Sequence, residues 1–225
     1  MIRPPELYGI ADGDALGPAP GLKVSGTGEV DPVTAAVVAM AEAGIRWIQI
    51  RLKSSDDREI FQVVERCVRR LEGSEARLWV DDRPDVAALL PVFGVHVGQD
   101  DLPPAAARRV LSSRQAIGLS CHDEHQIRRA DEDPAVDVVA CGPVFPTRSK
   151  KLPDPTIGLD GVRAARRATR KPLVAIGGID LTNARQVLDA GADTVVVLGA
   201  LCRGDVGRNS RRWVTALEER VDESK

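Results

Sequence analysis

The sequence is poor in aromatic side chains and in cysteine. Aromatics make up 3% of its 225 residues, so Val, Leu, Ile and Ala must fill the core. The four cysteines are far apart and form no CxxC pair, which argues against a zinc site or a disulfide framework and is typical of a reducing cytosol. We therefore expect a cytoplasmic protein.

The sequence also lacks a strong net charge and a long apolar run. Its formal net charge is −2, so no overall attraction draws it to nucleic acid or to an anionic membrane. No segment approaches the length of a transmembrane helix, and residues 1–6, with two prolines and a glutamate, do not resemble a signal peptide. We expect no nucleic-acid or membrane partner, and any anion site must be local.

Short apolar segments recur along the chain, with segments of helical composition between them. Most are apolar on both faces, which is typical of a parallel sheet covered by helices. The expected strands are residues 7–11, 47–51, 77–82, 94–98, 116–122, 136–144, 172–178 and 194–200. The expected helices include residues 32–43, 55–71, 103–111, 161–169 and 182–190.

Eight strands alternating with helices predict a closed (β/α)8 barrel, the TIM barrel, rather than an open sheet. We expect one α/β domain over residues 1–225 with a parallel eight-stranded core. A Gly/Pro-rich stretch around residues 12–30 is expected to be a loop insertion after the first strand. Active sites of such barrels lie at the carboxyl ends of the strands, so the residues that follow each strand indicate the function.

The second expected strand ends with Gln49, Arg51 and Lys53. Alternate residues of a strand project to the same side, so two cations and an amide converge there and suit a polyanion. The alternative is a solvated strand end whose cations pair with Asp56 or Asp57. These residues alone leave both interpretations open.

Two pairs of aspartates, Asp81-Asp82 and Asp100-Asp101, follow the third and fourth expected strands. Carboxylates at neighbouring strand ends repel one another unless a cation lies between them. Oxygen ligands without a Cys or His cluster suggest Mg²⁺, which is often shared with a substrate phosphate. Helix N-capping by Asp82 and Asp101 is the alternative, but it accounts for only one aspartate of each pair. Two pairs on neighbouring strands favour the metal.

Histidine and serine occur near the fourth and fifth expected strands. Ser120 and His122 end the fifth strand and could contact a substrate, although a helix-capping serine or an exposed histidine are equal alternatives. His125 lies in the following helix and is expected to be exposed. His96 lies between two valines inside the fourth strand, where a structural role is expected.

Hydroxyls, cations and glycines follow the last three expected strands. They are Thr147, Ser149 and Lys150 after the sixth, and Gly177, Gly178 and Gly199 after the seventh and eighth. Glycines permit close backbone approach, so that N–H groups can hold an oxyanion, and the last two strands carry the common phosphate site of this fold. Two separate anion sites predict two phosphorylated substrates or one long one.

With these motifs in place, the chain resembles the thiamin phosphate synthase family, whose relatives include thiazole tautomerases. The matching segments run nearly end to end and include LYGIAD, IQIRLK, DDRPDVA, GVHVGQDDLP, IGLSCHD, GPVFPTRSKK, VAIGGI and AGADTVVVLGAL. Their order and their places on the eight strands also agree. The family's synthases join a pyrimidine methyl diphosphate to a thiazole phosphate, forming thiamin phosphate and releasing diphosphate.

The resemblance implies roles for individual residues. The pyrimidine diphosphate side would comprise Gln49, Arg51, Lys53, Asp81, Ser120 and Lys150, of which Arg51, Ser120 and Lys150 would be catalytic. The thiazole phosphate side would comprise Thr147, Ser149, Gly178, Leu198 and Gly199. Mg²⁺ would be the cofactor, bound by Asp82 and Asp101. Cations would neutralise the leaving diphosphate, and the thiazole nitrogen would attack the resulting pyrimidine methyl cation without a side-chain nucleophile.

The chain departs from the family at several positions. Asp81 stands where the family usually has asparagine, and a carboxylate cannot donate a hydrogen bond to diphosphate. It should therefore weaken diphosphate binding unless it turns toward Mg²⁺ or Lys53. Leu52 replaces a common acidic residue, Ser149 a threonine and Gly199 a serine. The last two changes still leave a hydroxyl or a backbone N–H.

Two other functions stay open on the sequence. One is a thiazole tautomerase with His122 as acid or base, against which stand Asp82, Asp101 and Lys150, since a tautomerase does not need them. The other is a catalytically silent phosphate-binding relative, for which Asp81 is the main support. Small phosphorylated molecules are the expected partners in every case, and the sequence is compatible with a homo-oligomer.

Overall fold

The computed structural model describes residues 2–17, 30–147 and 155–219. Its core is a closed barrel of eight parallel strands that follow one another in chain order, with β8 paired to β1. The strands are β1 (Leu7–Asp12), β2 (Trp47–Arg51), β3 (Arg77–Asp81), β4 (Gly94–Val97), β5 (Ala116–Cys121), β6 (Val138–Cys141), β7 (Leu173–Ile176) and β8 (Thr194–Val197). Each coincides with a segment expected from the sequence, most being shorter at the carboxyl end. The (β/α)8 barrel is thus confirmed.

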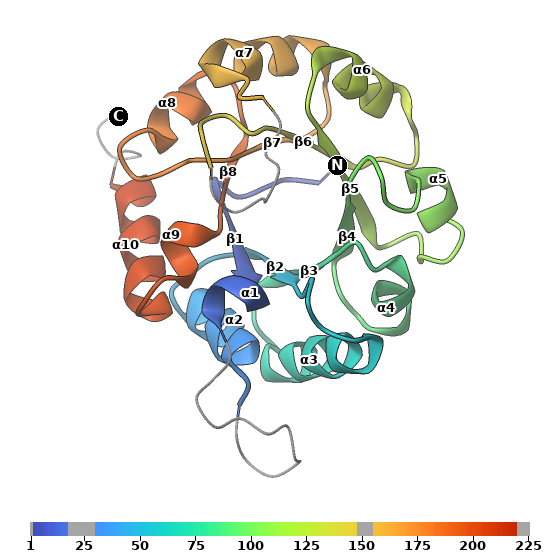
Figure 1. Ribbon diagram of the computed structural model, residues 1–225, viewed down its shortest axis with the longest axis vertical. Helices are drawn as coiled ribbons and strands as arrows, with labels where there is room; N and C mark the ends of the chain where they lie inside the picture. Colours follow the sequence, from blue (N-terminus) through green and yellow to red (C-terminus); the bar gives the residue numbers. More distant parts are fainter. Residues whose placement is uncertain (1, 18–29, 148–154, 220–225) are drawn as a thin grey trace.

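Helices form a ring around the strands (Figure 1). They are α1 (Gly13–Leu16), α2 (Pro32–Glu42), α3 (Asp57–Arg70), α4 (Pro84–Leu89), α5 (Pro104–Ala107), α6 (Glu124–Glu132), α7 (Gly158–Ala168), α8 (Ala184–Asp189), α9 (Gly199–Cys202) and α10 (Val206–Glu218). Helix α1 occupies part of the loop expected around residues 12–30, and residues 18–29 lie outside the described part of the chain. No helix within the described ranges is both long and apolar enough to cross a lipid bilayer.

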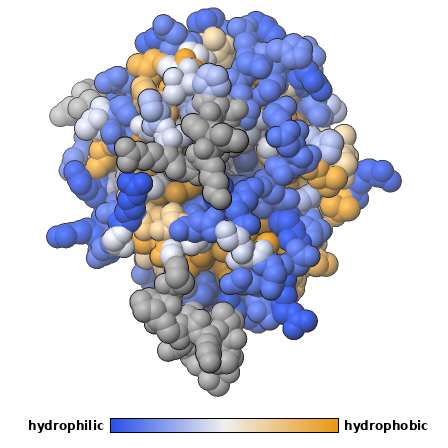
Figure 2. Space-filling model, viewed as in Figure 1, coloured by the Kyte–Doolittle hydropathy of each residue, from blue (hydrophilic) through white to orange (hydrophobic). Residues whose placement is uncertain are grey.

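Aspartate caps explain where the longer helices begin. The Asp31 side chain accepts a hydrogen bond from the Thr34 N–H at the start of α2. The same arrangement starts α3, α6 and α10, at Asp56, Asp123 and Asp205. Each such cap stabilises a helix by about 1 kcal/mol. The helices turn hydrophilic residues outward, and such residues cover most of the outer edge of the molecule in Figure 2.

The scarce aromatic residues gather inside the barrel. The single tyrosine, Tyr8, and two of the three tryptophans, Trp47 and Trp79, are buried there. Ring centroids lie 5.6 Å apart for Tyr8 and Trp47, 5.0 Å for Trp47 and Trp79, and 5.2 Å for Trp79 and Phe93. Such tilted and edge-on contacts stabilise aromatic pairs beyond simple burial. Bulky rings therefore fill the barrel interior on the side of β1 to β4.

Trp79→Ala should lower the free energy of unfolding by about 3–5 kcal/mol, because it leaves a cavity where three rings meet. Urea denaturation followed by circular dichroism measures this change. Leu89→Ala is the control, since Leu89 is 72% exposed and its truncation should change stability by less than about 0.5 kcal/mol. Similar losses in the two variants would contradict the central role of the aromatic cluster.

Candidate functional site

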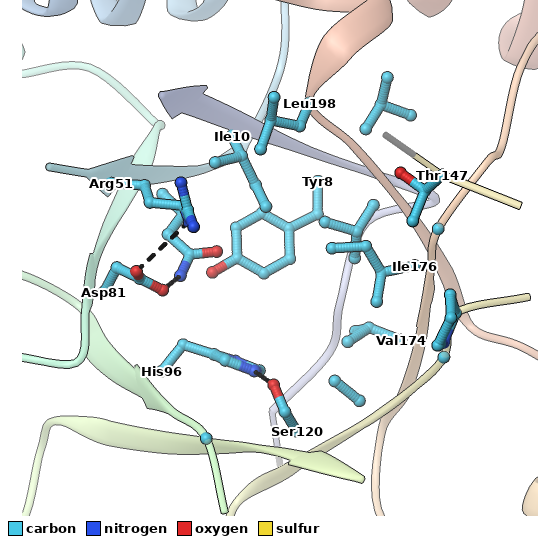
Figure 3. A pocket seen from close by; sticks show the side chains of 18 of the residues that line it. Tyr8, Ile10, Arg51, Asp81, His96, Ser120, Thr147, Val174, Ile176 and Leu198 are labelled. Atoms are coloured by element: carbon cyan, nitrogen blue, oxygen red, sulfur yellow. Dashed lines mark hydrogen bonds and ion pairs between the residues drawn. The ribbon is translucent and has the colours of Figure 1, made fainter. Parts of the chain in front are cut away.

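A cavity of about 1060 Å³ opens at the carboxyl ends of the strands (Figure 3). All of the predicted site residues that the structure describes line it: Gln49, Arg51, Lys53, Asp81, Asp82, Asp101, Ser120, Thr147, Gly178, Leu198 and Gly199. Ser149 and Lys150 lie outside the described residues. Side chains that come from widely separated parts of the chain thus meet in one place.

Strand alternation explains why these particular side chains reach the cavity. In β2, Gln49 and Arg51 line the cavity, whereas Ile48 and Ile50 are buried in the hydrophobic layer outside the barrel. Successive strand residues point to opposite faces, so the order of apolar and polar residues in β2 decides which group faces the barrel axis. The period-two prediction for Gln49 and Arg51 is borne out by this geometry.

Ion pairs hold the cations of β2. Arg51 binds the Asp12 carboxylate, and its Nε lies 3.6 Å from Asp81 Oδ2. Lys53 binds Asp82, and its Nζ lies 3.3 Å from Asp81 Oδ2. Asp12 is not among the site residues predicted from the sequence, although it occurs two and four residues after the cavity-lining Ile10 and Tyr8, at the same period.

The alternative partners considered from the sequence, Asp56 and Asp57, have other roles. Asp56 caps α3, and Asp57 pairs with Arg83 at 2.8 Å. Because the cations of β2 instead bind carboxylates of the cavity, this strand end is part of the site and not a solvated tail.

Asp81 lies at the centre of the polar side of the cavity. Its Oδ1 accepts a hydrogen bond of 2.6 Å from Gln49 Nε2. Burial raises the pKa of Asp81, an effect that Lys53 and Arg51 oppose and Asp101 reinforces. Within the described part of the chain its Oδ2 accepts no well-directed hydrogen bond, although Lys53 is close enough for an ion pair. The partners of this oxygen are thus the cations Lys53 and Arg51.

Asp82 and Asp101 do not cap helices. The N-cap positions of α4 and α5 are Arg83 and Pro103, and neither helix has a side-chain cap. Asp101 Oδ2 instead accepts a hydrogen bond of 2.7 Å from the Gly98 N–H. Asp82 adopts a left-handed backbone with φ of 55°, a conformation that costs a non-glycine residue on the order of 1–2 kcal/mol. The capping interpretation is therefore wrong, and the strain at Asp82 is typical of a functional position.

His96 is buried, in agreement with the structural role expected for it, and its ring also lines the cavity. Its Nε2 lies 2.9 Å from Ser120 Oγ, and its ring packs over Gly118, where any side chain would collide with the imidazole. Burial lowers the pKa of His96 to about 4, so the ring is neutral at pH 7. The flanking Val95 and Val97 face outward, whereas His96 faces the cavity.

Substrate contact and exposure were the two alternatives for His122, and exposure was expected for His125. His122 lines the cavity, and its Nδ1 lies 2.9 Å from the Gly142 carbonyl oxygen. His125 is exposed, as expected.

The opposite side of the cavity is apolar and rich in glycine. Val174, Ile176, Val196 and Leu198 form its wall. Gly178 has φ of 61°, and a Cβ there would lie 2.6 Å from the Pro146 carbonyl oxygen. Only glycine fits this close approach between the loops after β6 and β7. The loop after β6 is thereby held against the loop after β7.

Among the described residues, no three acidic, histidine or cysteine side chains converge closely enough to enclose a metal ion by themselves. The carboxylates of Asp81, Asp82 and Asp101 nevertheless line the same cavity. A hard cation that keeps several waters or substrate oxygens fits such a set better than a metal held by protein alone.

Comparison with known proteins gives a consistent result. The family model described as thiamine monophosphate synthase matches residues 23–201. A thiamine-phosphate synthase of Koribacter versatilis is 42% identical over 200 residues, covering 89% of this chain and 90% of that protein. One of Albidiferax ferrireducens is 40% identical over 166 residues, covering 74% and 75%. The solved thiamine phosphate pyrophosphorylase of Pyrococcus furiosus superposes with a TM-score of 0.79 at 29% identity, covering 95% of this chain and 96% of that one.

Gly178→Ala should lower the free energy of unfolding by about 2–4 kcal/mol, since it adds backbone strain and a collision with the loop after β6. The matched control is Gly73→Ala. Gly73 also has positive φ, 78°, but nothing lies within 4 Å of its Cβ position, so this variant should lose only about 1 kcal/mol. Chemical denaturation compares the two. Equal losses would show that the loop contact at Gly178 does not matter.

Proposed function

The chain belongs to the thiamine monophosphate synthase family, and we propose that it joins a pyrimidine methyl diphosphate to a thiazole phosphate in a Mg²⁺-dependent reaction that yields thiamin phosphate and diphosphate. It is thus a transferase of thiamine biosynthesis. One observation carries the site assignment: a single cavity combines cations and carboxylates on one side with an apolar, glycine-rich wall on the other.

The polar side suits the diphosphate. Arg51 and Lys53 would neutralise the negative charge that grows on the departing group, which is electrostatic catalysis. Lys150, beyond the described residues, would add a third cation. Asp12 and Asp82 hold Arg51 and Lys53 at the cavity, so both cations lie where the diphosphate would arrive.

Asp82 and Asp101 would hold Mg²⁺, with Asp81 beside them. The exclusively oxygen-containing donor set of these carboxylates supports a hard divalent cation. When bound, Mg²⁺ would withdraw charge from the leaving diphosphate. The carboxylates of the chain would supply some of the oxygen ligands of Mg²⁺, and water and diphosphate would supply the others.

Ser120 would contact the pyrimidine. Its hydroxyl is oriented by His96, whose low pKa keeps the ring uncharged. A neutral partner is an advantage here, because a second positive charge would oppose formation of the pyrimidine methyl cation. The thiazole nitrogen would then attack this cation from the apolar side, while its anchored phosphate holds it in line.

No side-chain nucleophile is needed. Cys121 is a candidate nucleophile because it lines the cavity. Burial raises its pKa to about 12, so it is a thiol and not a thiolate at neutral pH. The tautomerase alternative gains no support either, because its isomerisation would leave the cation and carboxylate cluster without a purpose.

We further propose that the enzyme is cytoplasmic and acts on small phosphorylated molecules, with no nucleic-acid partner. The net charge of −2 and the four free, buried cysteines support this proposal. Homo-oligomerisation stays a prediction.

Mixing the chain with pyrimidine methyl diphosphate, thiazole phosphate and Mg²⁺ should give thiamin phosphate, detected chromatographically. A chelator should slow the reaction about 100-fold or more, because a metal contributes several kcal/mol to stabilising a leaving phosphate group. Chelator saturated with Mg²⁺ is the control. Synthesis that is unaffected by the chelator would exclude the metal, and no synthesis in any condition would refute the proposed function.

Asp81 turns toward Lys53, 3.3 Å away, and so competes with diphosphate for that cation. Asp81→Asn should therefore bind inorganic diphosphate about tenfold tighter in the absence of Mg²⁺, because the neutral amide releases Lys53 and can donate a hydrogen bond. Isothermal calorimetry measures the dissociation constant. Asp100→Asn removes the same charge from an exposed residue of the same cavity and should change it by less than about threefold. Unchanged affinity in Asp81→Asn would show that Asp81 does not compete with the diphosphate.

A further inference from the structure

Three lysine or arginine side chains within the described residues line the cavity: Arg51, Lys53 and Arg203. The first two are engaged by the carboxylates of Asp12, Asp81 and Asp82. No carboxylate of the described residues pairs with Arg203, whose side chain is exposed in the loop between α9 and α10. Of these three side chains, Arg203 is therefore the one whose charge no described carboxylate neutralises, and it can bind an anion.

The guanidinium of Arg203 lies over the bare backbone of Gly199. A Cβ at Gly199 would be 3.9 Å from Cζ and from Nη2 of Arg203, and 4.0 Å from its Nε. These are the nearest atoms to that position, and both residues line the cavity. At these distances a Cβ would touch the guanidinium, so Arg203 and Gly199 adjoin one another at the same part of the cavity.

The backbone that carries Arg203 is anchored. Asn209 Nδ2, from α10, donates hydrogen bonds to the carbonyl oxygens of Arg203 at 2.7 Å and of Leu201 at 3.2 Å. Leu201 itself is fully buried. An exposed cationic side chain on a fixed backbone is prepared for ligand binding, since only its own rotamers have to be ordered.

We propose that Arg203 binds the phosphate group of the thiazole substrate at the part of the cavity where its guanidinium adjoins Gly199. This assignment rests on the proposed function. A phosphate monoester carries about 1.5 to 2 negative charges at pH 7, whereas the glycine loops offer only N–H groups. A guanidinium supplies the full charge and can form two parallel hydrogen bonds to phosphate oxygens. Arg203 follows β8, whereas Arg51 ends β2 and Lys53 follows it, with β1 between these two strands.

Steady-state kinetics on the full chain with Mg²⁺ test this role. Arg203→Ala should raise the KM for thiazole phosphate about tenfold or more, and leave the KM for the pyrimidine diphosphate within about twofold. With the phosphate-free thiazole alcohol as acceptor, wild type and variant should be equal, because there is no phosphate to bind. Arg208→Ala removes the same charge from an exposed position of α10 that does not line the cavity, and should behave as wild type.

A rescue variant separates ligand binding from a structural effect. Gly199→Ser in the Arg203→Ala background places a hydroxyl donor at the same part of the cavity, where a Cβ meets only ordinary van der Waals contacts. It should reverse part of the increase in the KM for thiazole phosphate. Equal increases in both KM values, or the same loss with the thiazole alcohol, would show a general structural defect and overturn the proposal.

Binding of thiazole phosphate alone, measured by calorimetry, gives a result that does not depend on turnover. Arg203→Ala should bind it about tenfold more weakly than wild type. Equal dissociation constants would overturn the role of Arg203 while leaving the synthase function intact if wild type makes thiamin phosphate. A wild-type chain that binds thiazole phosphate through Arg203 but makes no product would instead refute the proposed reaction and keep this anion site.

Discussion

The polar side of the barrel mouth depends on the largely buried carboxylate of Asp81. Gln49 donates to one of its oxygens, and Lys53 and Arg51 lie beside the other. A buried charge without such partners costs several kcal/mol, so removing any one of these groups leaves the others uncompensated. Strand register extends the arrangement around the barrel, because Asp12 is the neighbour of Arg51 and Asp81 is the neighbour of His96. The pairing of charges and the closure of the barrel therefore support each other.

The mouth is divided in a way that matches the proposed chemistry. Charges cluster on β1 to β4, where the diphosphate would depart, and apolar side chains with glycine loops line β6 to β8. Water is a competing nucleophile for a pyrimidine methyl cation, and an apolar wall next to the reacting atoms helps to exclude it. The neutral His96 and the unionised thiol of Cys121 fit the same requirement, since neither adds charge near the cation.

Much of this site follows from local pattern. Eight apolar segments with polar residues at their carboxyl ends are visible in the sequence, and period two assigns Gln49 and Arg51 to one face. Prediction from the sequence failed where one local pattern is compatible with two structures. Asp82 and Asp101 stand before prolines as helix caps do, yet they face the cavity. His96 lies between valines as a core residue does and is buried as that pattern predicts, although its ring also lines the cavity.

The sequence by itself determined the strands, the inward and outward faces of each strand, and the chemical character of the residues at the mouth. These are properties of neighbouring residues, governed by backbone geometry and burial. Only the tertiary structure decided which groups meet. Asp81 is 32 residues from Gln49, Asp12 is 39 from Arg51, and the Arg203 guanidinium lies over the bare backbone of Gly199. Such contacts depend on the stagger of strands in a closed barrel and on loop anchoring, which no local segment of the chain encodes alone.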